Sequence, residues 1–158
     1  MYGLAIYQLH GKHMGIQFQH AVTRFSRTYQ DRQEYIEWAD VHQTSIVLQG
    51  GTTNLNPDRL GTINIHFKTL IESGIECVAF YEPDLGDQMT SFVFLVDERV
   101  FNKEKYPDLN ADFLVENYDG IEDENLYMSR MTSDWIASVG GEKIVFLREY
   151  LKPLKLWA

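Results

Sequence analysis

The amino-acid sequence predicts an α/β fold in which helices cover a four-stranded mixed sheet, mostly parallel, with one antiparallel hairpin strand. Short apolar runs alternate along the chain with longer segments whose apolar residues recur every three or four positions, as strands alternate with amphipathic helices. Such alternation is typical of right-handed crossovers onto a parallel sheet. The last two apolar runs are separated only by a turn-rich segment, which predicts a hairpin and therefore one antiparallel strand.

The N-terminal part of this fold begins with an apolar and aromatic run over 2–9, which we expect to be a strand. Apolar residues then repeat at helical spacing over about 14–29 and, more briefly, over about 33–40, so two helices are predicted there. The β-branched run 44–49 is followed by Gly50-Gly51, which indicates a second strand that ends in a turn.

The middle of the chain opens with Asn56 before Pro57, a helix cap followed by the residue that is tolerated in a first helical turn. Apolar residues at helical spacing then continue to Gly74, which predicts a helix that stops at this glycine. Two strand-like runs, over 75–82 and 90–96, complete the predicted sheet as the hairpin.

The C-terminal part changes in character after residue 100, where acidic residues and helix breakers become frequent. We expect helices around 110–117 and 126–136 and a closing helix at about 141–152. At about 100 to 200 residues per domain, a chain of 158 residues corresponds to one domain. The prediction is therefore a single domain, 1–158, that carries an acidic insertion at about 101–140.

The negative charge of the chain is concentrated in this insertion. The whole sequence has 14 basic and 23 acidic residues, a net charge of −9. Residues 104–124 contain eight of the acids and one base, which leaves 13 basic and 15 acidic residues elsewhere. Because nucleic-acid affinity depends on basic residues that neutralise phosphates, the net charge argues against such a partner only where this segment covers the binding surface.

Cysteine content and hydropathy narrow the class of protein. Cys77 is the single cysteine, so no disulfide can form within the chain. No apolar run reaches the roughly 18 residues of a membrane span, and the first residues lack the pattern of a secretory signal. We therefore expect a cytoplasmic protein that does not contact membranes.

Polar side chains gather at the start of the first predicted helix. Gln17, His20 and Arg24 are spaced so that they share one face of that helix, turned away from its apolar stripe. Lys12 and His13 lie just before it, in the loop that follows the first strand. Open α/β sheets bind ligands outside the carboxyl ends of their strands, which makes this face a candidate site. An ordinary solvated helix face fits the same spacing.

A second candidate region is the tip of the hairpin. Asp84 and Asp87 lie in the turn, and Thr90 opens the returning strand. Loops on a rigid scaffold frequently carry binding groups, but aspartates also favour turns for conformational reasons alone. No cofactor motif accompanies these residues, and no cysteine or acid joins the nearby histidines at metal-ligand spacing. We therefore expect neither a cofactor nor a metal.

Motifs in the first helix and beyond are similar to those of a known enzyme family. Gly11-Lys12 followed by Gln17-Phe18-Gln19-His20-Ala21 resembles the G-K then Q-x-x-H-A signature of the archaeal and eukaryotic type of peptidyl-tRNA hydrolase. The resemblance covers about 1–100 and 141–158. It continues in the same order with a strand ending in Gly50, a helix closing on 73–75, an acid-rich loop from Glu82 to Thr90 and a leucine- and lysine-containing end at 147–156.

This resemblance implies a mixed α/β protein, usually a homodimer, that hydrolyses the ester between a peptide and the 3′ end of tRNA. Its partner would be peptidyl-tRNA. In the family, the site combines a lysine before the first helix, the glutamine and histidine of the Q-x-x-H-A turn, and an aspartate and a threonine of the hairpin loop. Carried over, the catalytic set is Lys12, Gln17, His20, Asp84 and Thr90.

Three further residues are expected to contact the substrate. His13 occupies the position of the family's lysine, four residues before the glutamine of the motif. Asp87 competes with Asp84 for the role of the acid, and Arg24 adds a positive charge on the same helix. In such a set an aspartate could activate or position a water, and the lysine could stabilise an oxyanion or hold a phosphate.

Two other functions fit the same residues. The scaffold could serve as a non-catalytic binding or inhibitory protein, whose acidic insertion docks a basic protein surface or covers the tRNA cleft. It could also hydrolyse or transfer a group on a different small substrate, since one fold hosts several chemistries.

Overall fold

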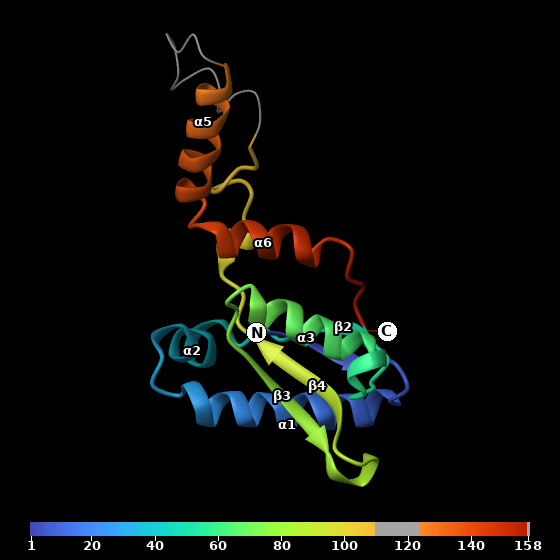
Figure 1. Ribbon diagram of the computed structural model, residues 1–158. Helices are drawn as coiled ribbons and strands as arrows, with labels where there is room; N and C mark the ends of the chain where they lie inside the picture. Colours follow the sequence, from blue (N-terminus) through green and yellow to red (C-terminus); the bar gives the residue numbers. More distant parts are fainter. Residues whose placement is uncertain (110–123, 158) are drawn as a thin grey trace. The chain divides into compact units, whose positions relative to one another are not determined.

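The computed structural model describes residues 1–109 and 124–157 (Figure 1). The chain forms two compact units. The first contains Met1–Val96 together with Leu154–Ala158, and the second contains Asp97–Pro153. The predicted acidic insertion and closing helix both fall within the second unit.

Four strands form a mixed sheet in the first unit. They are β1 (Tyr2–Ile6), β2 (Ile46–Gly51), β3 (Cys77–Glu82) and β4 (Gln88–Phe94), in the order β2-β1-β4-β3. β1 and β2 pair in parallel, whereas β4 pairs antiparallel with both β1 and β3. Three strands therefore share one direction and β4 opposes them, which confirms the predicted fold class and the hairpin.

Strand direction alone does not determine where β4 lies in the sheet. Because β4 lies between β1 and β3, two of the three neighbouring pairs are antiparallel, although three of the four strands run the same way. All residues of β4 after Gln88 are buried. A strand that is buried on both faces is best placed in the centre of a sheet with helices on both sides.

One face of the sheet is covered by α1 (Gly11–Tyr29). A Cβ atom on Gly3 of β1 would lie 2.5 Å from Cε2 of Phe18, so glycine allows the helix to approach the sheet closely. The helix begins three residues before the predicted start, so Lys12 and His13 lie in its first turn and not in a loop. The buried side chains of this layer are Met1, Phe18, Ala21, Val22, Phe25 and Val93.

The opposite face is covered by α3 (Thr62–Glu72), so the sheet lies between two helical layers (Figure 1). Successive residues of a strand point to opposite faces, and Phe92 precedes Val93, which belongs to the α1 layer. Phe92 meets the edge of Phe67 from α3, with ring centroids 5.4 Å apart, and Ile63 is fully buried.

The start of α3 differs from the predicted one. Asn56 and the proline after it open a separate 3₁₀ turn, Pro57–Arg59, in which the Asn56 side chain accepts a hydrogen bond from the Asp58 amide. Gly61 is the residue that precedes the first turn of the α-helix. The cap predicted from the sequence is therefore present, but it stabilises the turn before the helix.

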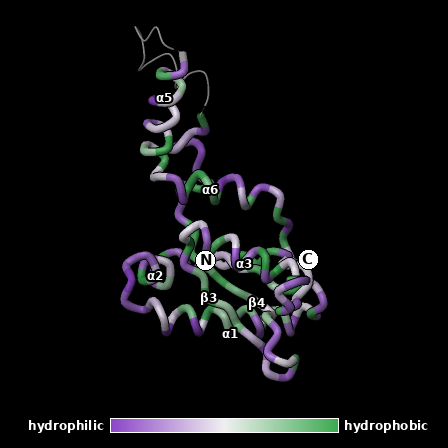
Figure 2. The backbone as a smooth tube through the Cα atoms, in the orientation of Figure 1, coloured by the Kyte–Doolittle hydropathy of each residue, from purple (hydrophilic) through white to green (hydrophobic). Residues whose placement is uncertain are grey.

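The predicted short helix is confirmed as α2 (Gln33–Glu37), which continues into a π-helical turn over Trp38–His42. Tyr35 anchors it, because its hydroxyl donates to Oγ of Ser26 on α1 at 2.8 Å. Figure 2 shows hydrophobic residues along β4 and hydrophilic residues in the connection between α1 and α2.

The two outer edges of the sheet differ. The outer edge of β2 is covered by the C-terminal segment: the Gln49 amide donates to the Lys155 carbonyl, and the Trp157 amide donates to the Val47 carbonyl, both at 2.9 Å. In the part of the chain that the structure describes, β3 has β4 as its one strand neighbour, so its other edge carries no strand.

The second unit contains α5 (Glu124–Ser138) and α6 (Glu142–Leu151), which confirm the helices predicted around 126–136 and 141–152. The helix predicted around 110–117 lies outside the described residues. None of the described helices is both long enough and apolar enough to cross a membrane.

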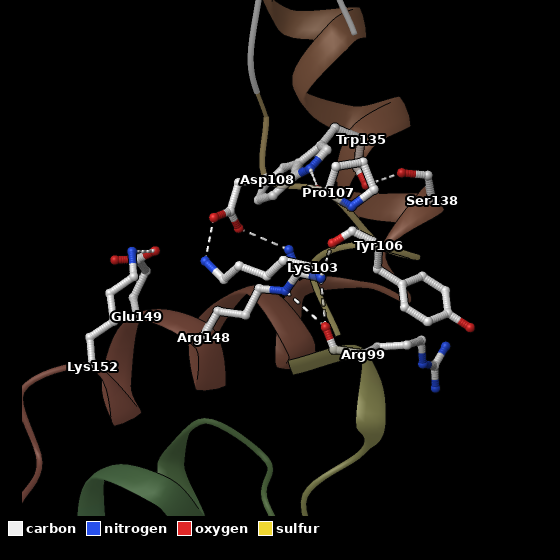
Figure 3. Close-up of polar contacts among 10 residues, drawn as sticks. All are labelled: Arg99, Lys103, Tyr106, Pro107, Asp108, Trp135, Ser138, Arg148, Glu149 and Lys152. Atoms are coloured by element: carbon white, nitrogen blue, oxygen red, sulfur yellow. Dashed lines mark hydrogen bonds and ion pairs between the residues drawn. The ribbon is translucent and has the colours of Figure 1, made fainter. Parts of the chain in front are cut away.

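A buried arginine ties the elements of the second unit together (Figure 3). Arg148 of α6 is 4% exposed. Its guanidinium donates to the carbonyl oxygens of Arg99 and Tyr106 and to the carboxylate of Asp108, at distances between 2.6 and 3.0 Å. Lys103 pairs with the same carboxylate. Each of the three guanidinium nitrogens thus has an acceptor, which compensates a charge that is costly to bury.

Candidate functional site

The carboxyl ends of β1, β2 and β3 lie at one end of the sheet, because the three strands run in the same direction. The first turns of α1 and the start of β4 lie at this end too, since α1 follows β1 closely and a short turn joins β3 to β4 (Figure 1). Ligands of open α/β sheets bind outside such strand ends. This end of the sheet is therefore the candidate site.

Gln17 of α1 is the centre of a hydrogen-bonded group at this end. Its amide nitrogen donates to Oε2 of Glu82 at 2.5 Å, and its amide oxygen accepts from the Thr90 hydroxyl at 2.9 Å. The Ser91 hydroxyl donates to the main-chain oxygen of Gln17 at 2.6 Å. Thr90 and Ser91 are fully buried. Contacts at both ends of the amide fix its orientation and hold the Glu82 carboxylate against α1.

A weaker contact extends this group toward the loop after β2. Gln88 is the residue of β4 that pairs with Glu82 of β3. The hydroxyl of Thr53 donates to Oε1 of Gln88 at 3.5 Å, the long limit for such a bond. Polar side chains from α1, the hairpin and the β2–α3 connection therefore meet at one end of the sheet.

The rest of the polar face of α1 lies against Phe80 of β3. The His20 ring stacks on Phe80 with centroids 4.6 Å apart, and Cζ of Arg24 lies 4.7 Å from the same ring centroid. A cation over an aromatic ring contributes about 0.5–1 kcal/mol at an exposed position. Burial raises the pKa of Tyr81, and the positive charge of Arg24 opposes that rise. Although His20 and Arg24 are exposed, their face is directed at β3 and is not an ordinary solvated surface.

The remaining predicted residues of α1 lie at its start. Lys12 and His13 are both exposed in the first turn. The His13 ring lies edge-on to His10, with centroids 6.3 Å apart and an interplanar angle of 63°. Among the described residues, no side-chain hydrogen bond or ion pair joins Lys12 or His13 to the Gln17 amide, so their predicted roles at the site remain predictions.

The two hairpin aspartates lie at the tip, and neither is a hydrogen-bond partner of the Gln17 amide. Asp84 lies in the 3₁₀ turn Pro83–Leu85, and Asp87 has a φ of 57°, in the left-handed region. Both are exposed, and among the described residues neither carboxylate has a hydrogen-bond or ion-pair partner. The choice between Asp84 and Asp87 as the acid therefore stays a prediction.

Glu82 is the residue that sequence reasoning did not assign to the site. It is half-buried at the end of β3 and is the acid that contacts Gln17. The alternation of Val78, Phe80 and Glu82 was the available signal, because residues two apart in a strand share a face. Val78 and Phe80 pack against the α1 layer, and Glu82 continues that row beside Gln17.

In the described part of the chain, His, Cys, Asp and Glu side chains form no group of three that could hold a metal ion. Comparisons with protein-family models, with curated proteins and with solved structures found no match.

Proposed function

We propose that the protein hydrolyses the ester bond between a peptide, or a blocked amino acid, and the 3′ end of tRNA. The observation that supports this most is the Gln17 amide held between Glu82 and Thr90. Gln17 and Thr90 are 73 residues apart in the sequence, and the resemblance to peptidyl-tRNA hydrolases assigns a role to both. Their direct hydrogen bond supports a shared role at the site.

Hydrolysis of the ester needs a base that deprotonates water and a hydrogen-bond donor that stabilises the oxyanion of the intermediate. In the proposed reaction a carboxylate takes a proton from water, and the resulting hydroxide attacks the carbonyl carbon of the ester. The tetrahedral intermediate then releases the ribose oxygen, which takes up the proton that the carboxylate had removed from water, and the peptide acid formed loses its proton to solvent. Glu82 is the carboxylate in contact with Gln17, whereas Asp84 and Asp87 are the alternatives from the hairpin tip. The ammonium group of Lys12 is the proposed donor to the oxyanion or to a phosphate.

The experiment is release of the amino acid from an N-acetylated aminoacyl-tRNA under single-turnover conditions. Gln17→Ala is expected to lower the rate at least tenfold, because it removes the group that orients Glu82 and Thr90. Gln19→Ala is the matched control, since Gln19 is an exposed glutamine on the same helix. Unfolding curves of both variants show whether the fold is retained.

Two results would contradict the proposal. One is wild-type protein without turnover at low salt, where the attraction between basic side chains and tRNA phosphates is least screened. The other is equal loss of activity in the Gln17 and Gln19 variants. Binding of tRNA without any turnover would instead support a non-catalytic protein on this scaffold.

A further inference from the structure

The outer edge of β3 is the open side of the sheet in the first unit. The corresponding edge of β2 is closed by the C-terminal segment, whereas β3 is paired on one side only within the described residues. An edge strand presents main-chain N–H and C=O groups, and these groups can pair with an added strand. Many proteins bind extended peptides in this way.

One side chain already contacts a main-chain acceptor of β3. Nη1 of Arg24 donates to the carbonyl oxygen of Ala79, in the middle of β3, at 3.4 Å. The acceptor is therefore within reach of groups outside the sheet. A distance of 3.4 Å lies beyond the usual range for a hydrogen bond between nitrogen and oxygen, so a peptide amide could replace the guanidinium at little cost.

The direction of β3 connects this edge to the candidate site. The strand runs from Cys77 to Glu82, and the carboxylate of Glu82 contacts Gln17. A peptide that pairs with the outer edge in the parallel direction would have its carboxyl end beside Glu82. The carboxyl end is the part of a peptidyl-tRNA that carries the ester.

We propose that the outer edge of β3 binds the peptide part of the substrate as an added parallel strand, which places the ester carbonyl next to Gln17 and Glu82. This proposal rests on the proposed function. β3 has six residues, and at about 3.3 Å per residue it spans about 20 Å, enough for a peptide of five or six residues.

Recognition through the main chain suits this substrate. A peptidyl-tRNA can carry any peptide sequence, and strand addition draws its affinity from main-chain groups that all peptides share. The charges next to the start of β3 are also balanced, because Arg32 and Glu76 form an ion pair at 2.5 Å. A balanced pair favours an uncharged main chain over a phosphate backbone at this end of the edge.

The test compares N-acetylated substrates that differ only in the peptide. One carries a single amino acid on tRNA, one carries four residues, and a series of the four-residue substrate carries one N-methylated amide at a time. N-methylation removes one hydrogen-bond donor and leaves the protein unchanged, so no variant has to fold.

The four-residue peptide is expected to lower KM about tenfold relative to the single residue, with kcat unchanged, for a gain of one to two hydrogen bonds. N-methylation should remove this gain at alternate positions only, since every second amide of a strand faces its neighbour. Amide hydrogen exchange in β3 should slow when the four-residue substrate analogue with a non-hydrolysable amide link is bound.

Three outcomes would overturn the proposal. Equal KM values for the short and long peptides would remove the strand site and leave the hydrolase intact. A loss of the gain at all positions or at none would exclude strand pairing. Slow exchange of the outer β3 amides in the free protein, together with a dimer in solution, would mean that a second copy occupies the edge. If no substrate is hydrolysed, the proposed function fails and this inference falls with it.

Discussion

The two units of the molecule each contain a polar cluster that joins distant parts of the sequence, but the two clusters differ in completeness. In the second unit, each nitrogen of Arg148 meets an acceptor, and the arginine side chain is almost fully buried. In the first unit, the Gln17 amide is fixed at both ends, yet Glu82 is half-buried and has accepting capacity left. A satisfied cluster stabilises a fold, whereas an incomplete one next to exposed polar residues can take a ligand.

The largest effect is expected for a change in the Gln17 cluster, where the proposed reaction takes place. Glu82→Gln keeps the size of the side chain and removes the proposed base, so we expect kcat for the acetylated substrate to fall roughly 100- to 10,000-fold. Asp84→Asn is the matched change at the hairpin tip. A larger loss in Asp84→Asn than in Glu82→Gln would assign the base to the tip and reduce Glu82 to a partner of Gln17.

The next effect concerns the satisfied cluster. Arg148→Met fills similar volume but leaves Arg99, Tyr106 and Asp108 without the guanidinium, so we expect the second unit to lose about 3–5 kcal/mol of stability. Amide hydrogen exchange in α6 measures this loss. Arg130→Met, at an exposed position of α5, is the control and should change stability by under about 0.5 kcal/mol. Similar exchange rates in the two variants would show that Arg148 is not the centre of the unit.

A smaller effect tests how α1 is seated, because Gln17 can reach Glu82 only if the helix lies close to the sheet. Gly3→Ala would press a methyl group against Phe18 and the main chain of Phe92, and we expect a loss of about 1–3 kcal/mol in urea unfolding. Gly15→Ala adds the same group in open space on α1 and should instead stabilise by about 0.5–1 kcal/mol. If α1 packed loosely on the sheet, Gly3→Ala would not destabilise the protein, and the two variants would no longer change its stability in opposite directions.

The smallest effect is the pH dependence of stability that arises from the Arg148 cluster in the second unit. The hydrogen bond from Lys103, aided by the charges of Lys103 and Arg148, lowers the pKa of Asp108 from its ordinary value of 3.8. A carboxyl with a lowered pKa in the folded state stabilises the fold above its unfolded pKa and loses that stabilisation as the pH falls through the folded value.

We therefore expect the second unit to lose stability below about pH 4, by at most about 1 kcal/mol because Asp108 is solvent-exposed. Exchange in α6 at several pH values measures this change. Asp97 contributes with the same sign, since Arg99 lowers the pKa of Asp97 as well. Asp108→Asn isolates the first contribution, and an unchanged pH dependence in that variant would assign the whole effect to other carboxyls.

Local patterns predicted much of the first unit, because they report which residues repeat on one side of a helix or strand. The repeat over 14–29 gave α1, and the turn-rich segment after Glu82 gave the hairpin. The Q-x-x-H-A motif singled out Gln17, which the structure joins to Thr90. Glu82, the acid in contact with Gln17, was not predicted, because the resemblance assigns the acid of the site to the turn and not to the last residue of the strand.

The sequence by itself determined the strands and most helices of the described residues, their order and the shared face of Gln17, His20 and Arg24 on α1, because helical and strand periodicity depend on near neighbours in the chain. Only the tertiary structure decided that β4 lies in the centre of the sheet, that Glu82 contacts Gln17 and that Arg148 is buried by three carbonyl and carboxylate partners. These outcomes depend on contacts between residues far apart in the sequence, where packing and the need to satisfy buried polar groups select one arrangement.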